Sequence, residues 1–458
     1  MEKEKGVLFV VFGATGNLTK KKLIPGIYNL VKRKGIKKFK ILGIARRPSS
    51  GHKIAMSGKK HIDGKIDSSA FSNVLANTHY VQMDFSESID YVKLQQRIQK
   101  YESDGFANKV FYLATGSDKF EVISSNLKKI GVTKEKKCWT RVVYEKPFGK
   151  NLKSAKKLNA CIHKIFDEKQ IYRIDHYLGK ELVENVLVLR FTNRVLEPVW
   201  NKYHVESISV VLDENVGIGE RGAYYDSYGA VLDMVQNHML QLLSLVTMEM
   251  PESFSGDFIQ NKKAELLKNV RITKTLVGQY KGYTSESGIP KNSKTETFAA
   301  HLLKIKNPRW NGVPIYFRTG KFLGKKESKI VINFKPVKCL FDKTCPSNGN
   351  SLEIRLFPNP GIELILNSKS PGKQAARNIK MDFCYDCEYG PNTPEGYENL
   401  FKDILLGNQT TFTREDELFN SWKIVDKVSR GKLHKYSKKS TGPKALEKFN
   451  KNSGVRLA

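Results

Sequence analysis

The sequence has few of the features that mark secreted or membrane-spanning chains. Its 458 residues include only six cysteines, too few to form a disulfide framework in a chain of this length, so we expect reduced thiols. The most apolar long segment, residues 223–249, carries acidic, amide and histidine side chains through its middle, which excludes a lipid-spanning helix. Glu-Lys-Glu-Lys after Met1 runs directly into an expected strand and leaves no room for a signal peptide. We therefore expect a cytoplasmic protein without a membrane partner.

Acidic residues are scarce relative to basic ones. Lysine and arginine total 78 against 46 aspartates and glutamates, which gives a net charge of +32. Such an excess can mark a nucleic-acid or membrane-surface protein. Here the lysines are scattered along the whole chain, with no RNA-binding signature and no zinc-finger spacing. We expect a basic, solvated surface with no specific nucleic-acid partner, whose field attracts substrates that carry several phosphates.

Metal-binding patterns are also sparse. Cys384-Tyr-Asp-Cys387 has the spacing of a metal or redox pair, with Cys339 and Cys345 upstream as possible further ligands. The upstream pair is separated by five residues, which does not match a second Cys-x-x-Cys. We therefore predict no metal site, and the sequence leaves the role of Cys384 and Cys387 open.

What the chain does contain is enough apolar material for two cores. Its hydrophobic fraction is 40%, and its length exceeds that of one ordinary core. Up to about residue 148, β-rich runs alternate with helical patterns, which predicts an N-terminal Rossmann-type parallel-sheet domain over residues 1–172. Its strands are expected at 7–12, 39–45, 79–84, 109–115 and 141–144, with helices at 18–34 and 151–169 and a mobile loop at 48–69.

The pattern changes after a domain junction placed at residues 171–175. Residues 173–432 predict a substrate-binding and oligomerisation α+β domain with a large, mainly antiparallel sheet, because many strands follow one another with little helix between them. Asn359-Pro360-Gly361 predicts a tight hairpin turn between two of them. Residues 433–458, rich in Lys, Ser and Gly, are expected to form a disordered basic tail. The strands are expected at 205–212, 299–305, 315–318, 330–334, 352–357 and 362–366, and the helices at 180–192, 224–249, 394–406 and 413–428.

The first expected strand ends in a glycine turn. It leads into Gly13-Ala14-Thr15-Gly16-Asn17-Leu18 and then a helix, so backbone N–H groups at the helix start can face a pyrophosphate. The spacing is shorter than the full G-x-G-x-x-G, and a plain strand-to-helix turn is the alternative. Arg46 and Arg47 follow the second strand, where an NAD enzyme has an acidic residue. Two guanidinium groups suit a 2′-phosphate, which predicts NADP, unless they are ordinary surface arginines.

Two clusters near the end of the first domain have donors suited to a phosphorylated substrate. Lys146, in Glu145-Lys146-Pro147, lies at the end of a strand on the cofactor side, where it can reach both nicotinamide and substrate; its bond to proline is a candidate cis peptide. His176, Tyr177 and Lys180 lie within five residues before a helix and form a donor array for a phosphate. The alternative is an ordinary helix start with a surface histidine.

A third cluster is a polar stripe on the apolar helix expected at 224–249. Asp233, Asn237 and Gln241 recur at four-residue steps, and His238 lies beside them. A buried structural histidine is the usual interpretation of such a pattern. Polar groups in a core helix need partners, however, and a bound sugar would supply them.

Together these segments resemble the glucose-6-phosphate dehydrogenase family. The combination of RIDHYLGK with EKPFG and QNH, in this order and spacing, is highly specific to that family. The matching stretches occur in the same order and span most of the chain, at residues 13–30, 145–159, 173–193, 219–251, 316–321 and 394–422.

The resemblance implies a reaction and a set of residue roles. The reaction is oxidation of D-glucose 6-phosphate to 6-phospho-D-glucono-1,5-lactone with hydride transfer to NADP, the first step of the oxidative pentose phosphate pathway, in a homodimer or homotetramer. His238 matches the general base for the hydroxyl on carbon 1, and Asp175 matches the carboxylate that orients it. Implied phosphate ligands are His176, Tyr177 and Lys180, with added charge from Lys326; sugar ligands are Lys146, Glu214, Asp233 and Lys321; cofactor ligands are Gly13, Ala14, Thr15, Gly16, Asn17, Leu18, Arg46, Arg47, Tyr112 and Lys146.

The chain departs from the family pattern at three places. Residues 113–117 lack the prolines that the family has there, and Asn17 stands where the family often has aspartate. Glu327 stands where some relatives have a basic residue of a second, structural NADP site, so we predict no second site. The alternatives are another NAD(P)-dependent sugar oxidoreductase, of the glucose-fructose oxidoreductase type, or a cofactor-binding protein that has lost catalysis. The first would not explain His176, Tyr177 and Lys180 together.

Overall fold

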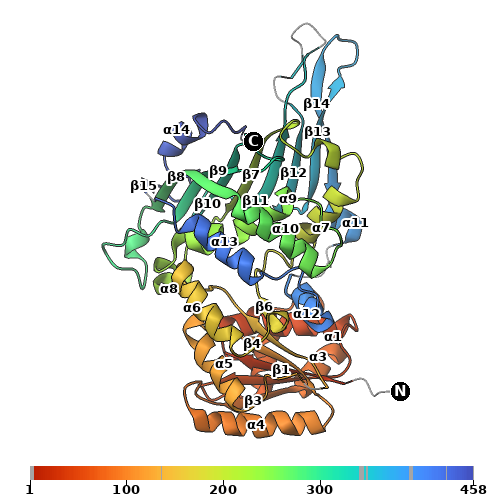
Figure 1. The fold of residues 1–458 in the computed structure, drawn as a ribbon, viewed down its shortest axis with the longest axis vertical. Coiled ribbons are helices and arrows are strands. Elements are labelled where there is room, and N and C mark those ends of the chain that lie inside the picture. Colours follow the sequence, from red (N-terminus) through yellow and green to blue (C-terminus); the bar gives the residue numbers. More distant parts are fainter. Residues whose placement is uncertain are drawn as a thin grey trace. The chain divides into compact units, whose positions relative to one another are not determined.

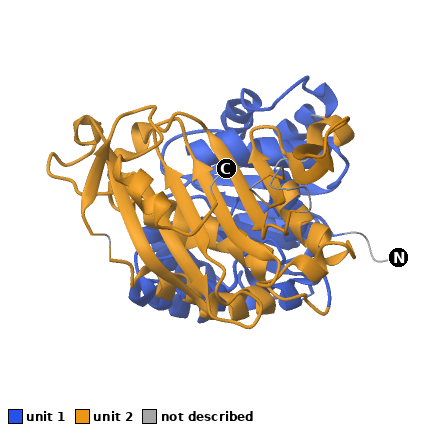
Figure 2. Ribbon diagram, turned by 90° about the horizontal axis from the view of Figure 1, so that it is seen from above, with its two compact units in different colours: residues 1–181, 253–260, 394–419 blue, residues 182–252, 261–393, 420–458 orange. Residues whose placement is uncertain are grey.

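The computed structural model describes residues 5–135, 137–339, 345–346, 349–390, 396–429 and 431–456. The chain divides into two compact units, which Figure 2 colours blue and orange. Unit 1 comprises residues 1–181, 253–260 and 394–419, and unit 2 comprises residues 182–252, 261–393 and 420–458. Unit 1 therefore includes two segments from far along the chain.

Unit 1 is built on a six-stranded parallel sheet, in the order β3-β2-β1-β4-β5-β6. The central strand β1 is buried along its whole length, as an uninterrupted apolar run in a parallel sheet should be. This confirms the predicted Rossmann-type sheet, and the segment taken as a junction supplies its sixth strand. The strands are β1 (Val7–Phe12), β2 (Phe39–Ala45), β3 (Thr78–Gln82), β4 (Asn108–Leu113), β5 (Thr140–Tyr144) and β6 (Ile171–Arg173).

The helices of unit 1 include one from the later part of the chain. In Figure 1, α12 (blue) lies beside α1 (red), and Phe401 of α12 packs edge-on against Phe9 of β1, with 5.7 Å between ring centroids. The helices are the π-helical turn η1 (Thr19–Leu23), α1 (Ile24–Lys32), α2 (Gly51–Lys59), α3 (Ser68–Ala76), α4 (Ser88–Ser103), α5 (Phe120–Lys129), α6 (Leu152–His163) and α12 (Gly396–Leu406).

The mobile loop expected at residues 48–69 is wrong. The segment contains α2, which is capped by Ser50, whose hydroxyl oxygen accepts a hydrogen bond from the Lys53 N–H. The two glycines of α2 serve close packing and not flexibility: a Cβ at Gly51 would lie 1.9 Å from the Thr78 carbonyl oxygen, and one at Gly58 would lie 2.4 Å from Ile24. Composition alone cannot distinguish these two uses of glycine.

Unit 2 is built on a nine-stranded sheet, in the order β14-β13-β12-β11-β7-β10-β9-β8-β15. Most pairs are antiparallel, while β10 with β7 and β15 with β8 are parallel. The predicted α+β class is confirmed, and so is the hairpin at Asn359, which joins β12 and β13 and has φ of 52°. The strands are β7 (Val205–Asp213), β8 (Val270–Tyr280), β9 (Phe298–Ile305), β10 (Ile315–Gly320), β11 (Glu327–Phe334), β12 (Ser351–Phe357), β13 (Gly361–Lys369), β14 (Ala376–Cys384) and β15 (Leu433–Tyr436).

The helix expected at 224–249 is interrupted. Gly229, with φ of +67°, lies between α8 (Gly222–Asp226) and a π-helical stretch, η6 (Val231–Met239), which continues as α9 (Leu240–Thr247). The other α-helices are α7 (Glu181–Phe191), α10 (Gly256–Lys268), α11 (Tyr385–Tyr389), α13 (Glu415–Val425) and α14 (Ala445–Lys451). Among the described residues, no helix combines the length and apolar character needed to span a bilayer.

The disordered tail expected at 433–458 is also wrong for residues 433–456. β15 pairs in parallel with β8 and forms the edge of the nine-stranded sheet, and α14 follows it. Tyr436, Leu446 and Val455 are buried in one cluster with Phe298. Because these apolar residues are about ten positions apart, they produce no periodic pattern that could predict the packing.

Four of the six cysteines form disulfides, which corrects the expectation of reduced thiols. Cys339 pairs with Cys345 and Cys384 pairs with Cys387, at Cα–Cα distances of 5.6 and 5.2 Å. The paired cysteines are six and three positions apart in the sequence, so neither disulfide closes a long loop. Cys138 and Cys161 are free thiols.

Candidate active site

The glycine turn after β1 is as tight as the sequence indicates. Gly13 has φ of +88°, and a Cβ there would lie 2.3 Å from the carbonyl oxygen of Ala114. The Gly16 N–H donates to the Gly13 carbonyl at 2.9 Å, and the Thr19 hydroxyl donates to the same oxygen at 3.2 Å. Any larger residue at position 13 would collide with the segment that follows β4.

A cavity of about 520 Å³ lies over this turn. It is lined by the residues that follow β1, β2, β3 and β4, including Thr15, Arg46 and Arg47. The sheet order reverses between β2-β1 and β4, so the cavity lies at the topological switch point where doubly wound folds bind ligands.

The backbone that presents the two arginines is held in place. Gln82 donates to the Arg46 carbonyl at 3.0 Å, and the Tyr80 hydroxyl donates to the carbonyls of Ala45 and Arg47. Within the described residues neither guanidinium group has an ion-pair partner, although the cavity wall also includes Asp84 and Asp118. Two cations are thus available to an anion.

Not all predicted cofactor residues reach the cavity wall. Ala14 is buried, and its Cβ lies 2.8 Å from where a Cβ on Gly43 would stand. Asn17 and Leu18 open the helix that follows the turn and are not part of the wall.

Tyr112 is buried, and its hydroxyl donates to Glu145 Oε1 at 2.6 Å. Tyr397 of α12 donates to the same oxygen at 3.2 Å. Burial raises the pKa of Glu145, and the two hydroxyls partly oppose that shift. The Glu145 carboxylate, held by two tyrosines, anchors the segment that carries Lys146, whose bond to Pro147 is cis. Sequence reasoning missed both Glu145 and Tyr397, although each lies in a matching stretch.

The segment after β6 gathers three predicted phosphate ligands. Asp175 is buried, and its Oδ1 accepts the Tyr177 N–H at 3.0 Å, which closes a tight turn. The ammonium of Lys180 lies 4.3 Å from the centre of the Tyr177 ring, and the centre of the His176 ring lies 5.0 Å from the centre of the same Tyr177 ring. The structure therefore brings His176, Tyr177 and Lys180 together.

α12 supports this turn. A Cβ at Gly179 would lie 2.6 Å from the Gly396 carbonyl oxygen, and Asn399 donates to the Gly179 carbonyl at 3.2 Å. The donor array thus depends on a helix more than 200 residues further along the chain.

One group in unit 1 has ligand types suited to a metal ion. His163 Nε2 lies 3.1 Å from Glu168 and 2.8 Å from Glu415, and in the described part of the chain no other such group occurs. Both Glu168 oxygens already accept hydrogen bonds from the buried Arg173, at 2.6 and 2.9 Å. We interpret the group as an ion-pair cluster that fixes β6, because Arg173 is the last residue of that strand.

In unit 2, His238 is fully buried on the π-helical stretch η6. Its backbone N–H is bonded to Asn237 Oδ1 at 2.6 Å. Hydrogen bonds in a π-helix join residues five apart, so Asp233 and His238 lie one turn from each other. π-Helical turns of this kind are frequent at functional sites.

Three predicted sugar ligands meet near this helix. Lys321 is buried, donates to Glu214 and lies 3.8 Å from Asp233 Oδ2. Glu214 directly follows β7 and Lys321 directly follows β10, and because these strands are parallel their ends lie side by side. Lys326 is apart from this group, with its ammonium 3.9 Å from the centre of the Phe357 ring.

Comparison with known proteins decides the family. Residues 10–185 match the model described as "Glucose-6-phosphate dehydrogenase, NAD binding domain", and residues 187–457 match "Glucose-6-phosphate dehydrogenase, C-terminal domain". The chain belongs to the glucose-6-phosphate dehydrogenase family. A "Glucose-6-phosphate 1-dehydrogenase" from Bacillus subtilis is 39% identical to it over 446 residues, which cover 92% of this chain and 91% of that one.

Solved structures of the family agree over the full length. A "Glucose-6-phosphate dehydrogenase in complex with its substrate glucose-6-phosphate" has a TM-score of 0.92 and 33% identity, and the match covers 100% of both chains. The enzyme from Mycobacterium avium has a TM-score of 0.87 and 32% identity, with 99% of each chain covered.

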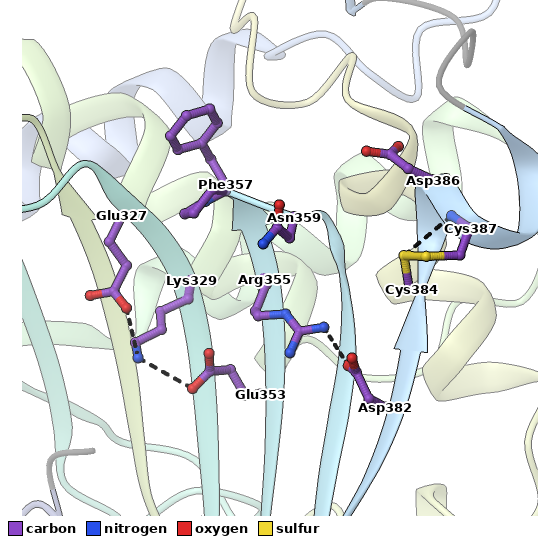
Figure 3. Close-up of a pocket in the computed structure, with 11 residues that line it drawn as sticks. Glu327, Lys329, Glu353, Arg355, Phe357, Asn359, Asp382, Cys384, Asp386 and Cys387 are labelled. Atoms are coloured by element: carbon purple, nitrogen blue, oxygen red, sulfur yellow. Dashed lines mark hydrogen bonds and ion pairs between the residues drawn. A yellow bond between two sulfur atoms is a disulfide. The ribbon is translucent and has the colours of Figure 1, made fainter.

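A second cavity in this glucose-6-phosphate dehydrogenase family member, of about 580 Å³, lies on strands β11, β12 and β14 (Figure 3). Its two cations are engaged by carboxylates: Lys329 by Glu327 at 2.9 Å and Glu353 at 3.3 Å, and Arg355 by Asp382. The Cys384–Cys387 disulfide closes one side of the cavity. The wall has more acidic than basic side chains, a poor match for a phosphorylated ligand.

Proposed function

We propose that this protein oxidises D-glucose 6-phosphate to 6-phospho-D-glucono-1,5-lactone, with NADP as hydride acceptor, as the first step of the oxidative pentose phosphate pathway. The observation that carries the proposal is the fully buried His238 on a π-helical turn that also carries Asp233, in a chain that matches both domains of the family. A purely structural histidine would not need the neighbouring group of Asp233, Glu214 and Lys321.

The chemistry assigned to the chain's own residues is a proton transfer. We assign His238 as the base that takes the proton from the hydroxyl on carbon 1, because the pKa of an imidazole near neutrality suits both removal and release of a proton. Asp175 orients the imidazole and stabilises its charged form. When bound, NADP supplies the acceptor for the hydride that leaves carbon 1 as the carbonyl forms.

Substrate residues divide by the group that they hold. We assign His176, Tyr177 and Lys180 to the phosphate, since imidazole and ammonium donors on either side of a phenol suit an oxyanion with several acceptors. Lys326 adds positive charge for the same group. Lys146, Glu214, Asp233 and Lys321 hold the sugar hydroxyls, for which alternating donors and acceptors are required.

The cofactor residues fit NADP. Gly13 and Gly16 have no side chains to cover the backbone, so the pyrophosphate can approach it, with Ala14, Thr15, Asn17 and Leu18 contributing backbone. Arg46 and Arg47, without ion-pair partners in the described chain, suit the 2′-phosphate. For Tyr112 the hydrogen bond to Glu145 supports an indirect role, in which it fixes the segment carrying Lys146.

We further propose that the protein acts in the cytoplasm as a homodimer or homotetramer assembled through the nine-stranded sheet. Strands β13 and β14 are half-exposed or exposed along most of their length, with Met381 56% accessible, which leaves apolar surface for a second copy. Light scattering after size-exclusion chromatography tests this, and a monomer at micromolar concentration would contradict it.

The reaction is tested by initial rates with four pairs, glucose or its 6-phosphate with NAD or NADP. We expect glucose 6-phosphate with NADP to be the fastest pair, because two separate groups of cations are assigned to the two extra phosphates. Equal rates on glucose and its 6-phosphate would favour another sugar oxidoreductase. No reduction with any pair would favour a protein that has lost catalysis.

A further inference from the structure

An ion pair between buried Asp213 and partly exposed Arg318 joins the two strands that present the sugar ligands. Asp213 is the last residue of β7 and precedes Glu214; Arg318 lies in β10, three residues before Lys321. Arg318 donates to Asp213 Oδ2 from Nε at 3.0 Å and from Nη2 at 2.6 Å. The pair therefore lies directly behind the ends of β7 and β10, from which Glu214 and Lys321 extend.

We propose that Asp213 and Arg318 are positioning residues that hold Glu214 and Lys321 in the arrangement needed to bind the sugar. The inference rests on the proposed function, since it concerns the same site. Neither residue touches the substrate, and both act through their neighbours.

Backbone contacts connect the pair to the two ligands. Asp213 is in register with Gly320, and the Glu214 N–H donates to the Gly320 carbonyl at 2.9 Å. The Thr319 hydroxyl donates to the Leu212 carbonyl at 2.6 Å. A shift of β10 against β7 at this end of the sheet would therefore move Lys321 relative to Glu214.

The ion pair has a second role, because it determines which carboxylates are available to contact Lys321. Lys321 is surrounded by acidic groups and contacts Glu214 and Asp233. Asp213, the residue before Glu214, is another carboxylate at this end of the sheet. Because Arg318 engages Asp213 with two hydrogen bonds, Lys321 is left to the two carboxylates that face the sugar.

Stability alone does not explain a charged pair at this place. Asp213 is 5% exposed, and its Oδ1 has no hydrogen-bond partner among the described residues. Removing two charges from water costs as much as their attraction returns, and apolar residues of similar volume often stabilise such a position better. The specific geometry of the ion pair is what an apolar pair could not supply.

A second arginine in the same sheet, Arg355, can serve as a matched control for Arg318. Arg318 lies 4.0 Å from Glu327, and the alternating charges continue over β11 and β12 to Arg355, which pairs with Asp382 and Glu363. Arg318 and Arg355 have side chains of similar exposure, 24% and 19%, and each lies near two carboxylates. Only Arg318 adjoins the sugar ligands.

The test compares Arg318→Gln with Arg355→Gln in the full-length protein. We expect Arg318→Gln to raise KM for glucose 6-phosphate by about 10-fold or more, since a misplacement of about 1 Å can cost about 10²-fold. KM for NADP should stay within about 2-fold of the wild-type value, because the cofactor residues lie in unit 1. Arg318→Lys should recover part of the loss, and Arg355→Gln should leave every constant unchanged.

The outcomes separate this proposal from the function itself. If the wild-type protein does not oxidise glucose 6-phosphate, the proposed function fails before any variant is made. If it does and Arg318→Gln has the wild-type KM, or Arg355→Gln raises KM equally, the positioning role is wrong.

Should Arg318→Gln fail to fold, the double variant Asp213→Asn with Arg318→Gln removes both charges together. A raised KM in that variant supports the proposal, and a normal KM overturns it.

Discussion

At the scale of single residues, the account depends on a few side chains whose surroundings differ from those of an ordinary protein surface or core. His238 is fully buried and lies on a π-helical turn, and Arg46 and Arg47 are exposed cations with no carboxylate partner in the described chain. An imidazole in the core is suited to proton transfer, and two neighbouring exposed guanidinium groups are suited to an anionic ligand. Each therefore supports a specific kinetic prediction.

Replacing His238 with asparagine should lower turnover by about 10³-fold or more, because a general base acts in the transition state. Binding of glucose 6-phosphate should survive, since asparagine still offers a donor and an acceptor of similar size. Steady-state kinetics and a binding isotherm measure the two effects separately. The exposed His61→Asn serves as control, and near-normal turnover of His238→Asn would remove this residue from the mechanism.

Replacing Arg46 and Arg47 together with alanine should raise KM for NADP by about 10-fold or more. KM for NAD should change far less, because NAD lacks the 2′-phosphate that the guanidinium groups hold. Arg377→Ala, an exposed arginine of β14, controls for the loss of surface charge. A parallel loss for both cofactors would mean that the arginines do not recognise the 2′-phosphate.

At the scale of elements, function depends on how neighbouring segments are fixed against one another. α2 packs against β3 and α1 through glycines. β7 pairs with β10, and the Asp213–Arg318 ion pair also links these two strands. Both features place backbone segments whose ends carry binding residues. Changes here should alter stability in ways that follow from local packing and charge.

Gly51→Ala should destabilise the protein by about 1–3 kcal/mol, the usual range for overpacking. The new Cβ would lie 1.9 Å from the Thr78 carbonyl oxygen, so β3 or α2 has to move. Thermal unfolding measures the effect, with the neighbouring exposed His52→Ala as control. Equal melting temperatures for the two variants would show that the segment tolerates a side chain here, as a loop would.

The pH dependence of stability reports on Asp213. Burial raises its pKa to about 6, despite Arg318, while in an unfolded chain an aspartate titrates at about 3.9. Between these values the folded protein holds the proton more tightly, so the free energy of unfolding falls as the pH rises from about 4 to about 6, by at most about 3 kcal/mol. The ionisable groups facing Asp213 are Arg318 and Tyr316 on β10, Glu327 and Lys329 on β11, and Tyr436 on β15.

Asp213→Asn removes this titration and leaves the others in place. Relative to the variant, the wild-type protein should therefore lose stability between about pH 4 and about pH 6, and melting temperatures recorded across that range measure the difference. A difference that does not change with pH would mean that Asp213 has an ordinary pKa in the folded protein.

At the scale of the whole molecule, the sequence predicted what depends on local pattern. The buried strands β1 and β2 were predicted with their observed bounds, because a continuous apolar run that stops at a glycine or an arginine is typical of a strand buried in a parallel sheet. The hairpin at Asn359 followed from turn chemistry alone. The group formed by His176, Tyr177 and Lys180 followed from their spacing, the group formed by Glu214, Asp233 and Lys321 came from the family resemblance, and the structure brings each group together.

What the sequence could not predict depends on contacts between distant segments. α12 joins unit 1 although it follows most of unit 2 in the chain, and only there does Tyr397 meet Glu145. β15 is stabilised by its pairing with β8, more than 150 residues earlier. The disulfides and the helix at 51–59 were missed because cysteine counts and glycine content do not report how closely two backbones approach.

The central claim, that the chain recognises a phosphorylated sugar, is tested most directly by one ratio, kcat/KM for glucose 6-phosphate divided by kcat/KM for glucose. We predict about 10²-fold or more for the wild-type protein with NADP, and a ratio at least about 10-fold smaller for Lys180→Ala, which loses binding to a group that does not react. In that variant the value for free glucose should be unchanged. A wild-type ratio near one, or an unchanged ratio in Lys180→Ala, would contradict the account.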